Sequence, residues 1–357
     1  MAARVKVFGS LVAEVINKGL CMYCGTCIAS CPVNVLFHSD EEKPVIKGIC
    51  VLCELCYYSC PRVEFSVYEA ERKVFGRART VDERLGVVRK SYMAKAKDEA
   101  VLKVCQDGGV ATALTIHALE SGFVDLAVLT GGGPEGGWKP QPLIASDRAG
   151  ALKGAGSKYS PGGSVSGVGE AAVGYPDYKV MYVGLPCQIQ GLRRLITSNK
   201  GNRKLGERVT LTIGLFCMDS YHHRSLMEKL SESKVNPAEV TKFDIKSNVF
   251  KAFQDGKTIF EAPIKDLDDG RMEGCGKCQD FTAELADISV GSMASPEGWC
   301  TVLVRSEKGE TLFKDAVKKG VVEAREIKDV GKLEILVKMS ERKRRREAPY
   351  LKLTVEA

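Results

Sequence analysis

The chain has 357 residues, enough for about two domains of ordinary size. Its 44% hydrophobic and 7% aromatic residues supply a core and exclude a disordered chain, and the formal charge of +7 is mild for this length. No stretch reaches about 18 consecutive apolar residues, so we predict no membrane-spanning helix. Because Arg4, Lys6 and Glu14 interrupt the first apolar residues, the sequence predicts no signal peptide and a cytoplasmic location.

The cysteines are the most informative part of the composition. There are 14, and eight of them fall in two runs 29 residues apart that both follow the pattern C-x2-C-x2-C-x3-C-P. In a long chain with no export signal, such crowding indicates metal binding rather than disulfides. Zinc is one alternative, since it often uses two CxxC pairs. Three closely spaced cysteines plus a fourth before proline are typical of [4Fe–4S] clusters.

The spacing divides these eight cysteines into two ligand sets. Three thiolates two residues apart can wrap one face of a cubane, and the fourth is directed to the partner cluster. The predicted sets are Cys21, Cys24 and Cys27 with Cys60, and Cys50, Cys53 and Cys56 with Cys31. This segment resembles a bacterial-type dicluster ferredoxin domain, which we place at residues 1–72. The pattern predicts that the protein moves single electrons.

The rest of the chain alternates between strand-like and helix-like segments. We expect a charged connector with a first helix at 62–97, a helix at 110–119 capped by Asp107, and a later helix at 189–196. Strands are predicted at 124–129, 179–183 and 209–217, β-hairpins at 240–265, and a last amphipathic helix at 332–346. This order predicts a mixed α/β domain over residues 73–340, followed by a basic tail at 341–357.

Glycine-rich loops follow several of these strands, where α/β sheets usually bind ligands. They include Gln106–Gly109, Thr130–Gly133, Gly154–Ser160 and Gly184–Gln188. None of them matches G-x-G-x-x-G or a P-loop, so no Rossmann dinucleotide site is indicated. Each loop alone is typical of a structural turn. Together with a ferredoxin-like segment, they favour a flavin or nucleotide pocket.

Four further cysteines are candidates for a third cluster. Cys187 and Cys217 follow predicted strands, and Cys275 and Cys278 form a CxxC pair in a glycine-rich turn. Four thiols at loop positions can hold another cubane, although buried free cysteines often serve only as small apolar residues. Cys105 and Cys300 have no partner pattern and are interpreted as packing residues.

At these motifs the chain resembles the beta subunit of coenzyme F420-reducing hydrogenase and its relatives, across about residues 90–340. The resemblance rests on Gln-Asp-Gly-Gly-Val110, Gly-Ser-Lys-Tyr-Ser160, Gly-Leu-Pro-Cys-Gln188 and Gly-Cys-Gly-Lys-Cys278. Within that family the chain looks most like the F subunit of reduced-coenzyme-F420 dehydrogenase, the electron-input module of an archaeal respiratory complex related to methanogenesis. Cys105 is a departure, since relatives commonly carry serine there.

The resemblance implies an oxidoreductase that takes hydride from reduced coenzyme F420 onto FAD and passes single electrons through [4Fe–4S] clusters to a partner complex. The implied FAD-binding residues are Gln106, Asp107, Gly108, Gly109, Ala111, Thr112, Thr130, Lys158, Tyr159, Ser160, Gly184, Pro186 and Gln188. No catalytic side chain is assigned, because hydride transfer needs no general acid or base. Two alternatives are the F420-reducing beta subunit of a hydrogenase or formate dehydrogenase, and a non-enzymatic electron carrier without an organic cofactor.

The charge balance bears on the partners. Three clusters of about −2 each would bring the formal charge close to zero, so nucleic acid is not an expected partner. The anionic tail of coenzyme F420 requires some basic residues, for which Lys158, Arg193 and Arg194 are candidates. The basic run Arg342–Arg346 is expected to be a solvated helix end, with docking to a membrane complex or to the cytoplasmic face of a membrane as the alternative.

Overall fold

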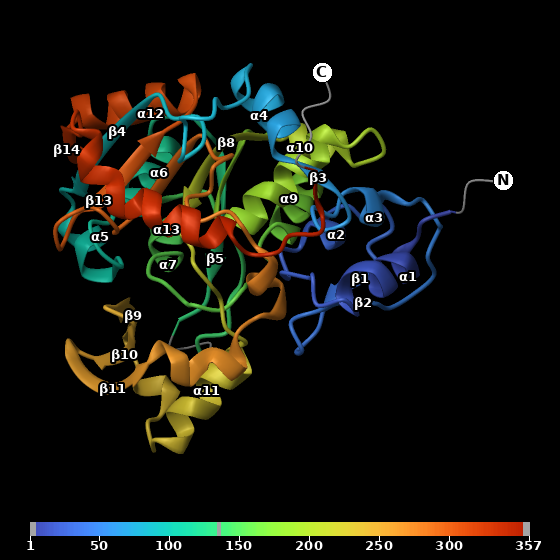
Figure 1. The fold of residues 1–357 in the computed structure, drawn as a ribbon, viewed down its shortest axis with the longest axis horizontal. Coiled ribbons are helices and arrows are strands. Elements are labelled where there is room, and N and C mark those ends of the chain that lie inside the picture. Colours follow the sequence, from blue (N-terminus) through green and yellow to red (C-terminus); the bar gives the residue numbers. More distant parts are fainter. Residues whose placement is uncertain (1–4, 134–136, 353–357) are drawn as a thin grey trace.

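In the computed structural model, which describes residues 5–133 and 137–352, the central feature is an eight-stranded mixed sheet (Figure 1). Its strands are, in spatial order, β14 (Val322–Glu326), β4 (Lys90–Ala96), β13 (Cys300–Val304), β12 (Ile288–Gly291), β8 (Val209–Leu215), β7 (Val180–Gly184), β5 (Leu126–Gly131) and β6 (Gln141–Ala145). The four strands β12, β8, β7 and β5 run parallel, and the outer pairs are antiparallel. The predicted mixed α/β domain is therefore confirmed.

Helices cover both faces of the parallel strands. One face carries α5 (Glu99–Val104), α6 (Val110–Glu120), α7 (Arg148–Lys153) and α12 (Glu307–Lys318), and the other carries α8 (Ser166–Gly174), α9 (Pro186–Thr197) and α10 (Arg203–Glu207). Successive side chains of β5 point to opposite faces of the sheet. Ala127 and Leu129 pack into the core on the first face, while Leu126 and Val128 pack into the core on the second. Strands buried on both faces explain the nearly continuous apolar runs of the sequence.

The N-terminal segment is a small unit with a core of its own. Its elements are α1 (Phe8–Leu11), η1 (Val12–Ile16), α2 (Thr26–Ala29), β1 (Leu36–His38), β2 (Pro44–Ile46), α3 (Leu55–Tyr58), β3 (Phe65–Ser66) and α4 (Val67–Phe75). Phe8, Leu11 and Tyr57 pack around the cysteines, whereas Phe65 and Ala70 already belong to the core of the sheet domain. The last strand, β15 (Leu351–Lys352), pairs in parallel with β3.

A second addition lies on another side of the sheet domain (Figure 1). It contains α11 (His223–Glu232), η3 (Pro237–Glu239) and the three-stranded sheet β9 (Lys242–Lys246), β10 (Val249–Gln254) and β11 (Lys257–Pro263). The predicted hairpins at 240–265 are confirmed, with Gln254 opposite Lys257. After η4 (Ile264–Gly270) and η5 (Glu273–Lys277) the chain returns to the large sheet, and η6 (Val330–Leu333) leads into the last helix, α13 (Glu334–Arg344).

Two local predictions are wrong. Lys90–Ala96, placed in a connector, is a strand paired on both sides, and its apolar residues Tyr92, Ala94 and Ala96 pack into the first core. Asp107 does not cap α6: Gly109 occupies the N-cap position with a φ of 69°, and the cap has no side-chain hydrogen bond. Among the described residues, no helix is long and apolar enough to cross a membrane.

Candidate functional site

The first four predicted ligands surround one cavity. Cys21, Cys24, Cys27 and Cys60 all line it, together with Met22 and Arg62. Cys27 lies on α2, and Gly25 starts this helix with a φ of 89°. An added Cβ at Gly25 would lie 2.0 Å from the Gly163 carbonyl oxygen, so glycine is required where the motif meets the large domain.

The second four predicted ligands surround a separate cavity, lined by Cys31, Cys50, Cys53 and Cys56. The backbone repeats with the sequence: Glu54 begins α3 with a φ of 65°, as Gly25 begins α2. The Leu52 N–H donates to Cys50 Sγ over 3.4 Å, just as the Tyr23 N–H donates to Cys21 Sγ over 3.4 Å. Sulfurs that accept amide hydrogen bonds are suited to carry thiolate charge.

The second site is the more exposed of the two. Cys53 is solvent-exposed, and it is flanked by exposed apolar side chains, with Ile49 87%, Val51 55% and Leu52 59% exposed. By contrast, Cys60 of the first site is buried. Any group held by the second set would therefore lie closer to the surface.

Cys187, Cys217, Cys275 and Cys278 are also brought together, although they come from three separate segments. Cys187 lies in the first turn of α9 after β7, Cys217 follows the parallel neighbour β8, and the other two lie in and after η5. Cys187, Cys275 and Cys278 are 5%, 2% and 2% exposed. Burial raises the pKa of Cys275 to about 12, and the nearby Cys217 and Cys278 thiols contribute.

Cations surround this third set. Lys343 Nζ donates to the Cys217 carbonyl oxygen (2.5 Å), and Arg346 Nη1 donates to the Cys275 carbonyl oxygen (2.8 Å). Burial raises the pKa of the Cys278 thiol, but Lys343 and Arg62 outweigh this effect and bring it below its ordinary value. Lys343 is 2% exposed, so the expectation of a fully solvated basic run is wrong.

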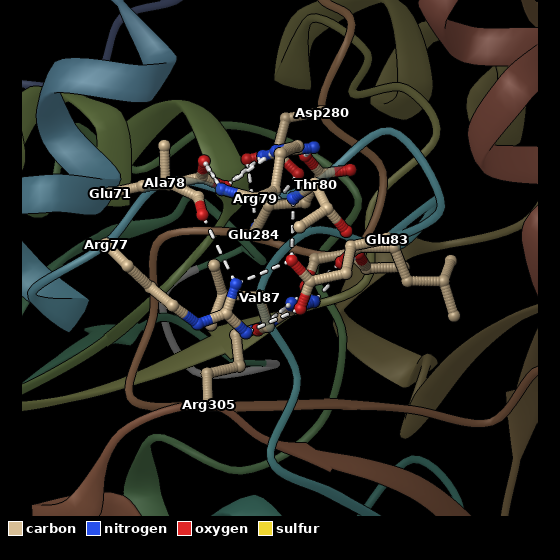
Figure 2. Close-up of polar contacts among 12 residues, drawn as sticks. Glu71, Arg77, Ala78, Arg79, Thr80, Glu83, Val87, Asp280, Glu284 and Arg305 are labelled. Atoms are coloured by element: carbon tan, nitrogen blue, oxygen red, sulfur yellow. Dashed lines mark hydrogen bonds and ion pairs between the residues drawn. The ribbon is translucent and has the colours of Figure 1, made fainter.

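An ionic network fixes the loop that follows Cys278 (Figure 2). Arg79 bridges Glu71 (Nη2–Oε1 2.6 Å) and Glu284 (Nη1–Oε2 2.5 Å), and the Glu284 backbone N–H donates to Asp280 Oδ1 over 3.1 Å. Buried Arg305 donates to the carbonyl oxygens of Leu85 and Val87 from the adjoining connector. The network ties the end of the CxxC turn to the chain that leaves the N-terminal unit.

A large cavity of about 790 Å³ opens at the carboxyl ends of β5, β7 and β8, in the size range of ligand sites. It is lined by eleven of the thirteen residues predicted to bind FAD: Gln106, Asp107, Gly109, Ala111, Thr112, Thr130, Lys158, Tyr159, Ser160, Gly184 and Gln188. Gly108 and Pro186 are not among the lining residues. Instead, an added Cβ at Gly108 would meet the Ala94 carbonyl oxygen at 3.0 Å, and Pro186 forms the first turn of α9.

The small sheet and the last helix complete this cavity. Its lining includes Asp244 from the small sheet, Lys265 and Arg271 from η4 and the residue after it, and Arg342 and Arg346 from the basic run. Nothing in the local sequence predicts that these residues reach the cavity, because they are brought there by contacts between distant segments. Gln106 Nε2 donates to Asp244 Oδ1 (2.7 Å), which joins the predicted loop to β9.

Several of the residues predicted to bind FAD form hydrogen bonds to backbone groups of the loops. Lys158 Nζ donates to the carbonyl oxygens of residues 154–156 at 2.9–3.0 Å, and burial lowers its pKa to about 8. Gln188 Oε1 accepts from the Leu185 N–H (2.7 Å), which closes the start of α9. By contrast, Ser160 Oγ is buried with no hydrogen-bond partner among the described residues, so it is available to a ligand.

The candidate basic residues for an anionic tail do not all reach the cavity. Arg193 is buried and donates to the Leu285 carbonyl oxygen (2.9 Å) and Thr212 Oγ1 (2.9 Å). Arg194 donates to the Tyr58 carbonyl oxygen (3.1 Å). Neither lines the large cavity, because α9 presents them to the protein interior.

The three cysteine sets and the cavity adjoin one another in a defined order. Cys217 lines the large cavity and also belongs to the third set. Burial raises the pKa of Cys187, and the charge of Cys24 from the first set adds to this effect. Gly274, which precedes Cys275 of the third set, packs against the first set: an added Cβ at Gly274 would lie 2.5 Å from the Cys21 carbonyl oxygen. Burial likewise raises the pKa of Cys27 in the first set, and Cys56 from the second set contributes.

Comparisons with known proteins identify the family to which the chain belongs. The profile of a 4Fe-4S binding domain matches residues 14–37, which include the first cysteine run. The profiles of the coenzyme F420 hydrogenase/dehydrogenase beta subunit match residues 91–167 (N-term) and 177–330 (C terminus). The chain belongs to this family of coenzyme F420-dependent beta subunits.

Individual relatives are similar over most of their length. The beta subunit of coenzyme F420 hydrogenase of Methanothermobacter thermautotrophicus is 34% identical, over 73% of this chain and 92% of that protein. The F subunit of F(420)H(2) dehydrogenase of Methanosarcina mazei is 30% identical, over 95% of this chain and 93% of that protein. A chain of the F420-reducing [NiFe] hydrogenase complex from Methanosarcina barkeri superposes with a TM-score of 0.69 at 32% identity, covering 75% of this chain and 92% of that one.

Proposed function

We propose that this chain is the coenzyme F420-reacting subunit of a larger redox complex. In this proposal it binds FAD in the large cavity and three [4Fe–4S] clusters in the three cysteine sets. The observation that carries the proposal is that Cys217 lines the cavity and also lies in a set of four buried or half-buried cysteines beside the N-terminal sites. Family membership supports the choice of substrate.

The residues present fit these cofactors. Four cysteines border each N-terminal cavity, and the buried Ser160 Oγ in the large cavity lacks a partner among the described residues. When bound, a flavin supplies the conversion between a two-electron hydride and single electrons, which clusters accept one at a time. The loops at 106–112 and 184–188 would hold it, with the start of α6 offering backbone amides to an anionic group.

The same residues would hold the reacting rings and exclude water. Gln106 is fixed by Asp244, and Tyr159 Oη accepts from the Ile245 N–H (3.0 Å), so both loops are joined to β9. The addition that carries β9 would thereby close the cavity over the substrate, and Lys265, Arg271 and Arg342 are the cations available to an anionic tail.

The proposed electron path connects the cavity with the third set, then with the first set, and reaches the surface at the second. A hydrogenase would use it toward coenzyme F420, and an F420H2 dehydrogenase would use it away from coenzyme F420. It is supported by the packing of the first set against the third, by the electrostatic influence of Cys56 on Cys27 and by the exposure of Cys53. Our first choice for the physiological complex is a hydrogenase, since hydrogenase beta subunits share the higher identity. The electron-input subunit of F420H2 dehydrogenase is the second candidate, because that relative matches 95% of this chain, including both cysteine runs.

The test is an assay of the anaerobically purified chain, reconstituted with FAD, iron and sulfide. We expect it to reduce a one-electron acceptor dye with reduced coenzyme F420 and not with NADH. Comparable rates with NADH would overturn the substrate assignment, and a protein that retains iron but never flavin would support a simple electron carrier instead. Copurification with a hydrogenase large subunit or with membrane-complex subunits would distinguish the two candidate complexes.

A further inference from the structure

Arg62 is the most unusual charged residue in the structure. It follows the second Cys-Pro pair, and its side chain is buried, with only 3% of the residue exposed. None of its three guanidinium nitrogens has a hydrogen-bond partner within the described residues. Its guanidinium carbon lies 4.0 Å from the centre of the Tyr350 ring. A buried cation with so little compensation is costly, so a negative group is expected beside it.

The neighbours of Arg62 identify that group. Arg62 lines the first cysteine cavity, and its backbone N–H donates to Cys60 Sγ over 3.4 Å. The third set adjoins the same cavity, because Met22, which lines it together with Arg62, packs in one buried cluster with Cys187 and Cys275. The charge of Arg62 accordingly acts on thiols of the first set and of the third set. Arg62 is therefore the cation placed between the two sets. Lys343 faces the third set alone, with Cys278, Cys217 and Cys275 as its neighbours.

From this placement we infer that Arg62 is a positioning residue shared by the first and third clusters, and that it raises the reduction potential of both. The inference rests on the proposed function, since it needs both clusters. A [4Fe–4S] cluster with four thiolates carries about −2, and about −3 after it accepts an electron. A buried cation stabilises the reduced form more, because the attraction grows with charge and is weakly screened in a dry interior.

This arrangement has a consequence for electron flow. Two adjacent anionic clusters repel each other, and an electron on one disfavours an electron on the other. A guanidinium between them offsets this repulsion, so that an electron can move from the third cluster to the first without a proton. The second cluster lies beyond this cation and borders an exposed cysteine, and its potential should be independent of Arg62.

The experiment is a redox titration of the anaerobic, fully reconstituted chain, followed by low-temperature electron paramagnetic resonance. We compare Arg62→Met, Arg62→Lys, Lys343→Met and the control Arg345→Met, which removes an exposed charge from the end of α13. In Arg62→Met, the first and third clusters should become at least tenfold harder to reduce, equivalent to 59 mV for one electron, and the potential of the second cluster should not change. Lys343→Met should lower the reduction potential of the third cluster alone. Arg345→Met and Arg62→Lys should change the three potentials little or not at all.

The outcomes separate this inference from the proposed function. If the wild type holds about twelve irons and Arg62→Met leaves all three potentials unchanged, the inference is wrong and the proposed clusters stand. If the wild type holds only about eight irons, there is no third cluster and both fail. If Arg62→Met loses clusters, retention of about twelve irons by Arg62→Lys supports a role for the charge. Equal loss of iron from Arg62→Met and Arg62→Lys overturns the inference.

Discussion

The N-terminal cysteine sites and the third cysteine set differ in how the fold brings their ligands together. In the N-terminal sites, three ligands of each set lie within seven residues of sequence, and the backbone repeats the same turn at Gly25 and Glu54. In the third set, Cys187 and Cys217 meet only because β7 and β8 are parallel neighbours. Local sites can form before the domain is complete, whereas the third set depends on the whole sheet. We therefore expect substitutions in the sheet domain to remove the third cluster while the N-terminal clusters persist.

The largest expected effect is the loss of one complete cluster. Cys275→Ser should remove about four of about twelve irons and slow flavin reoxidation, while hydride transfer to FAD continues. The N-terminal clusters should persist, because their ligands do not include Cys275. Iron analysis and stopped-flow absorbance measure both effects. Full reconstitution of the wild type with only about eight irons would show that the four cysteines are structural.

A substitution at Gly109 tests the cavity. Gly109→Val should abolish FAD retention and leave the N-terminal clusters intact. The structural reason is the backbone: Gly109 has a φ of 69°, and an added Cβ would lie 2.8 Å from Val101 Cγ1 in the core, so α6 could not begin where it does. Flavin released on denaturation is the measurement. A variant with stoichiometric FAD would remove this loop from the binding site.

The ionic network of Figure 2 should couple the stability of the third cysteine set to the segment that leaves the N-terminal unit. Arg79→Met leaves Glu71 and Glu284 buried without their shared cation, which should cost about 3–5 kcal/mol of unfolding free energy. Because Glu284 adjoins the CxxC turn, the third cluster should be lost at lower denaturant than in the wild type. Arg77→Met, whose partner Glu83 lies in an exposed pair, is the control and should change little. Equal effects of both substitutions would contradict the proposed link.

The smallest effect is a pH dependence from Lys158. Burial lowers the pKa of Lys158 to about 8, from an ordinary value of 10.5, so the unfolded chain binds more protons between these values. Stability should therefore rise with pH from about 8 to 10.5, on the order of 1–3 kcal/mol. Thermal unfolding across this range measures the rise, and Lys158→Met should abolish it. A rise that persists in the variant must come from another group.

Prediction from sequence succeeded where the determinants are local. The turn at Gln254–Lys257 and the apolar strand β7 are each contained in a short window. It failed for β4, whose lysines give it a charged, connector-like composition although it pairs on both sides.

Burial within the basic run could not be predicted either, because it depends on distant contacts. Lys343 is buried against Cys217, which is 126 residues away, and nothing in Arg342–Arg346 itself distinguishes this lysine from its exposed neighbours. In the same way, Asp244 of the small sheet and Arg271, which follows η4, reach the cavity only through the tertiary fold. Local spacing identifies ligands on one segment, whereas residues contributed from several segments require the structure.

The pairing of β15 with β3 has a consequence for biosynthesis. Leu351 pairs with Phe65, and Tyr350 stacks on Arg62, so the segment that follows the cysteine runs is completed by residues near position 350. At about 5–20 residues per second, a ribosome needs roughly 15–60 s to make the intervening chain. During this interval both cysteine runs have left the ribosome without their last neighbours. Delivery of iron and sulfide to these runs can therefore begin early in translation, while the third set must wait until β7, β8 and η5 have been made.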